Sequence, residues 1–377
     1  MKFNEYLKNS LNQIKEKNLY RERFILDKNI INFCSNDYLG LKDNEYTKQK
    51  LKEFIKDLPV GSGASALVSG YYEIQKKLEQ NLSNLKDTES SIVVGTGYMA
   101  NIGLISAITT EEDIIFSDEY NHASIIDGIR LSKAKKFIYK HKDIEDLENK
   151  IKENKTKGNI FIITDGVFSM EGDIAPLKEL YQIAKIYDAV LIIDDAHATG
   201  VIGNGKGSLF EFNIKPDENI IQVGTLSKAI GSFGAFISGS KLLIDFLVNK
   251  ARPVIFSTAL SPVQNFISLI NLGIMQKEEF RRKELFEKSK YFASRLKEIG
   301  FNIEFHNTPI FSIILKDEKK ALIWRDYLLK NNIFIQAIRP PTVPIGSSRL
   351  RITISYSHKY EDIDKLLDIL SFMKENL

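Results

Sequence analysis

The sequence predicts an α/β protein built on a mostly parallel, seven-stranded sheet covered by helices, with a smaller α+β domain at its C-terminal end. Short apolar runs alternate with helical patterns through the middle of the chain, as in sheets whose strands are joined by helices. Most runs are rich in Ile and Val and do not alternate with polar residues, which is typical of strands covered on both faces. After about residue 275 the order of elements changes, which indicates a separate domain.

The expected strands of the large sheet are the apolar runs at residues 91–94, 113–116, 137–139, 160–164, 190–193, 220–223 and 235–237. A helix is expected at 176–187, because Pro176 suits a first helical turn and an apolar face follows it. The predicted divisions are an N-terminal helix and short strand at 1–45, a large α/β domain at 46–275 and a small α+β domain at 276–377.

The predicted C-terminal domain begins with a long helix. It continues with a strand, a second strand, a helix, two further strands and a closing helix. The two strands after the first helix are expected at 301–305 and 310–315, the next helix at 322–329, and the two further strands at 333–338 and 350–354.

Composition excludes several classes of protein. The 377 residues are 43% hydrophobic and 27% charged, and no stretch is long and apolar enough to span a membrane. The 52 basic and 49 acidic residues are interspersed, so no nucleic-acid footprint is predicted, and the lysine-rich segment 133–142 is expected to be solvated surface. The first residues lack the apolar core of a secretion signal, so a cytoplasmic location is expected. Cys34, the single cysteine, is expected to pack rather than react, and no metal site is predicted.

The run at 190–193 ends in two acids and, shortly after, a histidine. Asp194 can face a cationic ligand group such as a pyridinium nitrogen, and it can equally cap the turn that follows. His197, taken alone, is more typical of a core histidine. Neither residue alone indicates a ligand. Together they are suggestive, because ligands of such sheets bind at the carboxyl ends of strands.

The next run leads into Lys228, which is flanked by small residues that leave room for a ring. Enclosure lowers the pKa of an amine toward neutrality, as Schiff-base chemistry requires, although a lone loop lysine is usually surface. Thr225 and Ser227 supply hydroxyls suited to phosphate oxygens.

A third segment, Gly95–Asn101, follows a run and opens a helix, so its backbone N–H groups can bind an anion. It lacks the glycine spacing of dinucleotide and Walker motifs, and an ordinary turn is the simpler interpretation. His122 can lie over an aromatic ligand or be an ordinary loop histidine.

Together these segments resemble the fold-type I pyridoxal-phosphate enzymes, and specifically the α-oxoamine synthases. The resemblance covers nearly the whole chain. It includes the segments 36–40, 61–65, 68–70, 165–173 and 348–352 as well as the Asp194, Lys228 and His122 motifs.

The resemblance implies that pyridoxal 5'-phosphate is bound as a Schiff base on Lys228. It also implies that Asp194 pairs with the pyridinium nitrogen, that His197 and Ser169 lie near the phenolic oxygen, and that His122 stacks on the ring. The further residues that it implies are Gly97, Tyr98 and Thr225 for the phosphate, Arg351 for the amino-acid carboxylate, and Arg21, Thr342 and, as a weaker candidate, Arg339 for the acyl substrate.

Within the family, the segment 337–344 is similar to the branch that joins L-alanine to a pimeloyl thioester carried by coenzyme A or a carrier protein. The alternatives within the family are an enzyme that uses glycine with acetyl-CoA and another α-oxoamine synthase. The alternatives of a different class are an aminotransferase and a catalytically silent partner subunit. The resemblance also implies a homodimer. The chain departs from the family at Ala66, where many members have arginine, and at Ser227, which is often glycine.

Overall fold

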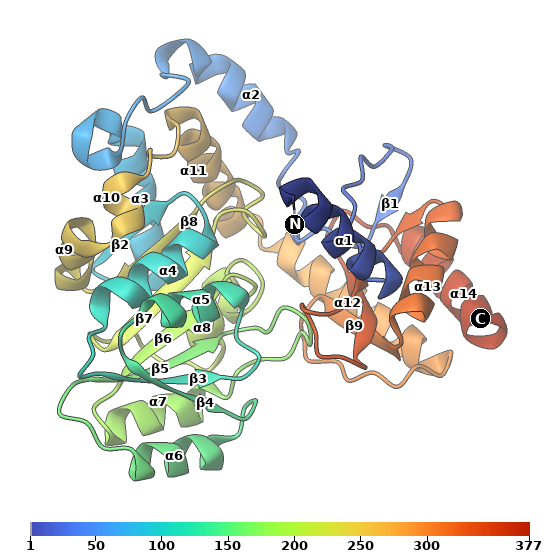
Figure 1. Ribbon diagram of the computed structural model, residues 1–377. Coiled ribbons are helices and arrows are strands. Elements are labelled where there is room, and N and C mark those ends of the chain that lie inside the picture. Colours follow the sequence, from blue (N-terminus) through green and yellow to red (C-terminus); the bar gives the residue numbers. More distant parts are fainter. Residues whose placement is uncertain (1) are drawn as a thin grey trace. The chain divides into compact units, whose positions relative to one another are not determined.

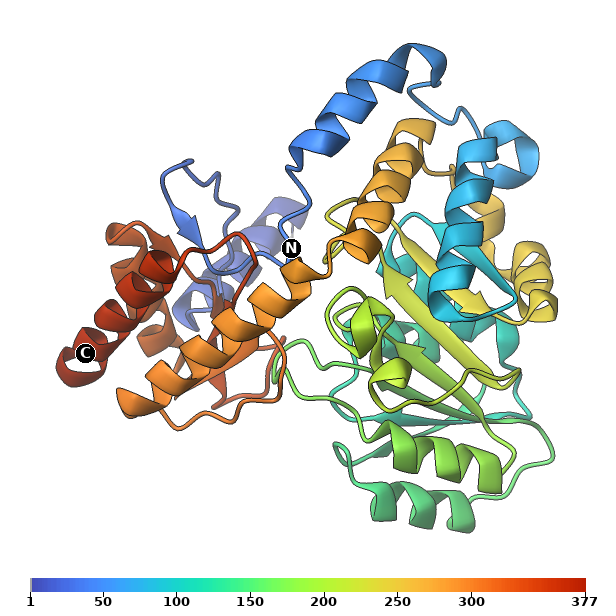
Figure 2. The same ribbon diagram turned by 180° about the vertical axis from the view of Figure 1, so that it is seen from behind.

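The computed structural model describes residues 2–377, which divide into two compact units (Figures 1 and 2). The larger unit consists of Asp37–Ser169 and Asp173–Lys283. The smaller unit consists of the described chain up to Asn36, the short segment Met170–Gly172 and Glu284–Leu377. The predicted N-terminal segment and the predicted C-terminal domain therefore share one unit.

The larger unit is built on a seven-stranded sheet in the order β2-β8-β7-β6-β5-β3-β4. From β7 to β4 neighbouring strands are parallel, whereas β8 is antiparallel to both β7 and β2. All seven predicted strands are confirmed to within two residues at each end. Their bounds are β2 Ser90–Val94, β3 Ile114–Asp118, β4 Lys135–Tyr139, β5 Ile160–Asp165, β6 Val190–Asp194, β7 Ile220–Thr225 and β8 Ala235–Gly239.

Helices cover both faces of this sheet. One core cluster joins the sheet to α4 Gly97–Ile108, α5 Ala123–Leu131 and α9 Lys241–Lys250, and a second joins it to α6 Ile144–Glu153, α7 Leu177–Ile186 and α8 Ser208–Glu211. Ile192 of β6 belongs to the first cluster, and its neighbours Leu191 and Ile193 belong to the second, as the strand pleat requires. Helices α4 and α5 lie in front of the sheet in Figure 1. Burial on both faces explains why the strand sequences are uniformly apolar.

The larger unit contains further helices around this core. Several begin with a side chain that accepts a backbone N–H, such as Asn44 before α2 and Ser261 before α11, where Pro262 takes the first helical position. The remaining elements are α2 Glu45–Phe54, η1 Ile55–Asp57, η2 Ala66–Gly70, α3 Glu73–Lys86, η3 Gly203–Gly205, α10 Arg252–Phe256 and α11 Pro262–Lys277.

The smaller unit contains a three-stranded antiparallel sheet in the order β11-β12-β9 and a two-stranded parallel pair, β1 with β10. In the parallel pair Ile31 lies opposite Ile333, so the two ends of the sequence share one sheet. The elements are α1 Phe3–Glu16, β1 Ile31–Asn32, α12 Phe280–Glu298, β9 Ile310–Lys316, α13 Glu318–Lys330, β10 Ile333–Phe334, β11 Ala337–Ile338, β12 Ser348–Thr353 and α14 Tyr360–Asn376. The division between the units falls within α12.

One predicted strand of this unit is wrong. Residues 301–305 alternate apolar and polar side chains, but their backbone joins no strand ladder. The apolar side chains satisfy the pattern by packing alone, because Phe301 lies edge-on to Trp324 and Phe305 stacks on Phe311. The predicted strand at 333–338 is also divided, into β10 and β11.

Cys34 packs in the smaller unit, where its sulfur accepts the backbone N–H of Gln336 at 2.9 Å. Burial raises the pKa of its thiol to about 12, so it is not a nucleophile. In the part of the chain that the structure describes, none of the helices is both long enough and apolar enough to cross a bilayer.

Candidate active site

The polar residues predicted for the larger unit follow the carboxyl ends of its strands. Strand β6 ends at Asp194, β7 at Thr225 and β5 at Asp165. Strand β2 runs in the same direction as β7, because both are antiparallel to β8, so the start of α4 follows the same edge of the sheet. The topology thus brings the predicted ligand-binding segments to one edge.

Asp194 is buried and held from two sides. The side-chain amide of Asn101 donates to one carboxylate oxygen at 2.6 Å, and the backbone N–H of Ala196 donates to the other at 2.9 Å. The same Asn101 amide donates to the hydroxyl of Ser124 at 2.8 Å. Asn101 comes from α4 and Ser124 from α5, so two helices fix the orientation of this carboxylate. Sequence reasoning did not single out Asn101 as its partner.

His122 immediately precedes α5, and its ring caps that helix. Its Nδ1 lies 2.7 Å from the Ser124 hydroxyl and accepts the Ser124 N–H at 3.2 Å. Burial lowers the pKa of this imidazole, and the positive charge of Lys228 lowers it further, while Asp194 acts in the opposite direction. Burial therefore favours the neutral ring, which lies within electrostatic reach of Asp194 and Lys228.

Lys228 lies in the turn between β7 and β8 and is half-buried. The turn is fixed by Thr225, whose hydroxyl donates to the carbonyl of Gly234 at 3.0 Å and lies 2.8 Å from the hydroxyl of Ser227. Gly231 has a φ of +64°, and a Cβ there would lie 2.4 Å from the backbone nitrogen of Lys42. Only glycine fits this close approach, so the turn that presents Lys228 depends on Gly231.

His197 is buried beside Tyr38, whose hydroxyl lies 2.6 Å from its Nδ1. Tyr38 belongs to the segment 36–40 of the family resemblance, and it is fully buried. Asp195, two residues before His197, is also fully buried. Its carboxylate forms an ion pair of 2.8 Å with Lys86, and neither side chain is exposed to solvent.

Gly97 and Tyr98 form the first turn of α4, which is capped by the hydroxyl of Thr96. A Cβ on Gly97 would meet nothing within 4 Å beyond its own stretch of helix in residues 2–377, so the space beside this glycine is open. The phenol of Tyr98 donates to Asp127, and Ser169 is half-buried in the loop after β5. These placements agree with an anion site at the helix N-terminus.

A second carboxyl group, that of Asp165, lies beside Asp194. The two residues are directly opposite each other in the β5–β6 ladder, and both are buried. Burial and the neighbouring charge of Asp194 raise the pKa of Asp165 well above its usual range. Burial and the charge of Asp194 therefore favour the protonated form of Asp165.

The remaining predicted residues lie in the smaller unit. Arg351, on β12, is buried and donates at 3.1 Å both to the side chain of Asn36 and to the hydroxyl of Thr353. Arg21 donates to the carbonyl of Pro340 at 2.9 Å, and Thr342 is exposed.

Arg339, the weaker candidate, is engaged by backbone. Its guanidinium donates to the carbonyl oxygens of Asn18 and Tyr20, and only 4% of the residue is exposed. Burial lowers the pKa of this group, and Arg325 and Arg21 lower it further. Arg339 thus serves to brace the segment that carries Arg21.

The larger unit has the donor set that pyridoxal phosphate requires. A buried carboxylate with fixed orientation suits the pyridinium nitrogen, a helix N-terminus with the hydroxyls of Thr225 and Ser227 suits the phosphate, and Lys228 offers an amine. The hydroxyl of Thr199 is buried and has no hydrogen-bond partner among the described residues, so a polar group is unsatisfied in the same turn as His197. The residues therefore fit this cofactor.

Comparisons with known proteins agree with this fit. The family model for aminotransferase class I and II matches residues 28–370. The chain is 47% identical to the 8-amino-7-oxononanoate synthase of Lysinibacillus sphaericus, over 90% of this chain and 87% of that protein.

Two solved structures extend the comparison. A structure of the serine palmitoyltransferase SPT with PLP has a TM-score of 0.91 at 26% identity, and the match covers 98% of this chain and 97% of that one. The 8-amino-7-oxononanoate synthase from Francisella tularensis has a TM-score of 0.80 at 30% identity, over 93% of this chain and 99% of that one.

Proposed function

Because this chain belongs to the aminotransferase class I and II family and, within it, to the pyridoxal-phosphate-dependent α-oxoamine synthases, we propose that it joins L-alanine to a pimeloyl thioester. The products are 8-amino-7-oxononanoate, carbon dioxide and the free thiol, a step of biotin biosynthesis. The observation that best supports this chemistry is the buried carboxylate of Asp194, which Asn101 holds in a fixed orientation. The charges of Asp194 and Lys228 both influence the pKa of His122, so the three residues lie within electrostatic reach of one another. The names of the relatives support the substrates.

The cofactor would be held by residues of the larger unit. Lys228 would be its covalent anchor, Asp194 the partner of its ring nitrogen, and His122 the residue on its ring face. Ser169 and His197 would approach its phenolic oxygen. When bound, pyridoxal phosphate supplies an electron sink for the charge that develops at the amino-acid α-carbon.

Its phosphate would be bound by the first turn of α4 and by the turn after β7. The backbone N–H groups of Gly97 and Tyr98 would donate to the phosphate at the positive end of the helix dipole. The hydroxyl of Thr225, which donates to the carbonyl of Gly234 in this structure, would rotate to add a third donor.

Lys228 would also move the protons of the reaction. Its amine would take the proton from the α-carbon of alanine, after which a bond forms between that carbon and the acyl carbonyl carbon. The carbon–sulfur bond then breaks and the thiol leaves. Loss of the carboxylate as carbon dioxide leaves the α-carbon to be reprotonated, so the reaction consumes no oxidant or reductant.

Arg351 would bind the alanine carboxylate, because a guanidinium presents two parallel donors to it. Its existing contacts with Asn36 and Thr353 limit the orientations open to the guanidinium, which supports this role. On the acyl side, Arg21 and Thr342 would contact the pimeloyl chain. Coenzyme A or a carrier protein would present that chain, and the active enzyme would be a homodimer.

The proposal is tested by measuring thiol release from purified protein loaded with the cofactor. L-Alanine with pimeloyl-CoA should release thiol and yield a product with the mass of 8-amino-7-oxononanoate, and Lys228→Ala should do neither. Glycine with acetyl-CoA, alanine with shorter acyl-CoAs, and alanine with a pimeloyl carrier protein complete the panel. Faster turnover of glycine with acetyl-CoA than of alanine with either pimeloyl donor would show that the substrate assignment is wrong.

A further inference from the structure

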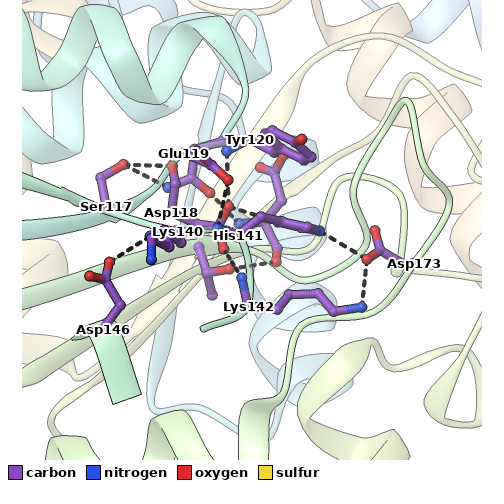
Figure 3. A network of polar contacts seen from close by, with 12 residues as sticks. Ser117, Asp118, Glu119, Tyr120, Lys140, His141, Lys142, Asp146 and Asp173 are labelled. Carbon is purple, nitrogen blue, oxygen red and sulfur yellow. Dashed lines mark hydrogen bonds and ion pairs between the residues drawn. The ribbon is translucent and has the colours of Figure 1, made fainter. Parts of the chain in front are cut away.

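His141 lies between two carboxylates at the edge of the sheet that carries the candidate site. It follows β4, and its ring reaches between Asp118, the last residue of β3, and Asp173, in the loop after β5 (Figure 3). Nδ1 lies 2.9 Å from an oxygen of Asp118, and Nε2 lies 2.9 Å from an oxygen of Asp173. The ring also stacks on Tyr120 and meets the edge of Phe168.

This geometry requires a doubly protonated ring. A neutral imidazole has one N–H, so its other nitrogen would direct a lone pair at a carboxylate oxygen. Both carboxyl groups also accept other hydrogen bonds, because Asp118 accepts the backbone N–H groups of Tyr120 and Lys142, and Asp173 accepts the ammonium group of Lys142 at 2.6 Å. An imidazolium satisfies both contacts at once.

The surrounding charges support the same state. Burial of the ring lowers the pKa of His141, but its hydrogen bonds to Asp118 and Asp173 and the charges of these two groups outweigh burial and raise that pKa to about 9. The other charged groups that face it are Lys142, on Asp173, and Glu119, whose carboxylate accepts the backbone N–H of His141 at 2.9 Å.

Each carboxylate that His141 holds belongs to a loop of the candidate site. The carbonyl of Asp118 accepts the N–H of Asn121, and Asn121 is bonded in turn to the backbone of Asp165 at 2.8 Å, directly before His122. The carbonyl of Asp173 accepts the N–H of Phe168 at 2.9 Å, directly before Ser169. His141 therefore joins the segment of His122 to the segment of Ser169.

We propose that His141, held as an imidazolium between Asp118 and Asp173, is a positioning residue that fixes the His122 and Ser169 loops for cofactor binding. The proposal rests on the proposed function only through the roles of His122 and Ser169. His141 does not touch the reacting atoms in this proposal, and it acts through the two loops.

The first test uses the unmodified protein. Imidazole NMR of ¹⁵N-histidine-labelled enzyme distinguishes the five histidines, and His141→Gln identifies the signal of His141. The expected result is a ring protonated on both nitrogens at pH 7 that titrates near pH 9. A His141 ring that is neutral at pH 7 would overturn the proposal.

The second test measures the dissociation constant of pyridoxal phosphate for apoenzyme variants. His141→Gln cannot bridge two carboxylates, and Asp173→Asn removes one of them, so both should weaken binding about ten- to hundredfold at pH 7.5. The difference between wild type and His141→Gln should shrink as pH rises through about 9, where the wild type loses its own imidazolium. His306→Gln is the matched control, because His306 lies 3.9 Å from Glu304 in the smaller unit.

Two outcomes would overturn the proposal: cofactor affinity of His141→Gln equal to that of His306→Gln, or a loss that is the same at pH 7.5 and pH 9.5. The second would indicate packing of the ring rather than its charge. Neither readout uses alanine or an acyl thioester, so the positioning role can stand or fail independently of the substrates.

Discussion

The hydroxyl of Tyr38 lies 2.6 Å from Nδ1 of His197, and both residues are buried. This contact fixes one nitrogen of His197 and leaves the other directed elsewhere. Which nitrogen carries the proton is decided by such a partner, so Tyr38 influences the tautomer that His197 presents in the candidate site.

Tyr38→Phe should therefore lower both stability and cofactor affinity by small amounts. Loss of one buried hydrogen bond costs about 1 kcal/mol, which corresponds to roughly fivefold weaker binding of pyridoxal phosphate if the effect is confined to the bound state. Urea unfolding and cofactor titration measure the two effects. Tyr187→Phe is the control, because its hydroxyl bonds to Glu148 at 3.1 Å, away from the site. Equal behaviour of the two variants would remove Tyr38 from the site.

Asp194→Asn should reduce turnover by at least about a hundredfold. The substitution removes the charge that would pair with the ring nitrogen, and loss of one member of a buried charge pair costs about 3–5 kcal/mol. It also places a second side-chain amide beside that of Asn101, which donates to a carboxylate oxygen of Asp194 at 2.6 Å in the wild type. Thiol release measures turnover, and Asp245→Asn, at an exposed ion pair with Lys241, is the control. Near-normal turnover of Asp194→Asn would contradict its assigned role.

Asp165→Asn should be tolerated, in contrast to its neighbour. A raised pKa means that the stability contributed by protonated Asp165 is complete below the pKa of the unfolded chain and is lost as pH rises toward the folded value. Asparagine does not titrate, so the variant should be at least as stable as wild type at pH 7, with the gap closing toward pH 4. Thermal unfolding across this range measures it. Strong destabilisation at pH 7 would show that an ionised Asp165 is needed.

Lys86→Met should destabilise the larger unit by about 3–5 kcal/mol, because it strands the charge of Asp195 in the interior. Asp195 would keep the hydroxyl and N–H of Ser208 as donors, but no cation. The double variant with Asp195→Asn should recover part of the loss. Lys241→Met, at an exposed ion pair, should cost less than about 1 kcal/mol. Urea midpoints provide the comparison, and a small effect of Lys86→Met would mean that solvent reaches this pair.

Sequence patterns identified the sheet because its strands are buried on both faces and are therefore uniformly apolar. They failed at residues 301–305, where alternation reflects packing of Phe301 and Phe305 and no ladder forms. Sequence patterns also drew attention to the polar residues at strand ends, because acidic and basic side chains stand out directly after an apolar run.

Partners that are distant in the sequence could not be predicted in this way. Asn101 reaches Asp194 across 93 positions and Tyr38 reaches His197 across 159. His141 was hidden for another reason. It lies within the lysine-rich segment 133–142, whose composition is typical of solvated surface, yet its ring and Lys142 are both bound to Asp173. Only the parallel register of β3, β4 and β5 brings these loops together.

The pairing of Ile31 with Ile333 has a consequence for synthesis on the ribosome. At about 5–20 residues per second, β1 waits roughly 15–60 s for β10 to be translated. The chain of the larger unit, which ends at Lys283, is translated within that interval and can fold before β10 appears. The apolar side chain of Phe33 stays uncovered until the last segments emerge, so a nascent chain stalled before β10 presents a ready target for chaperones and proteases.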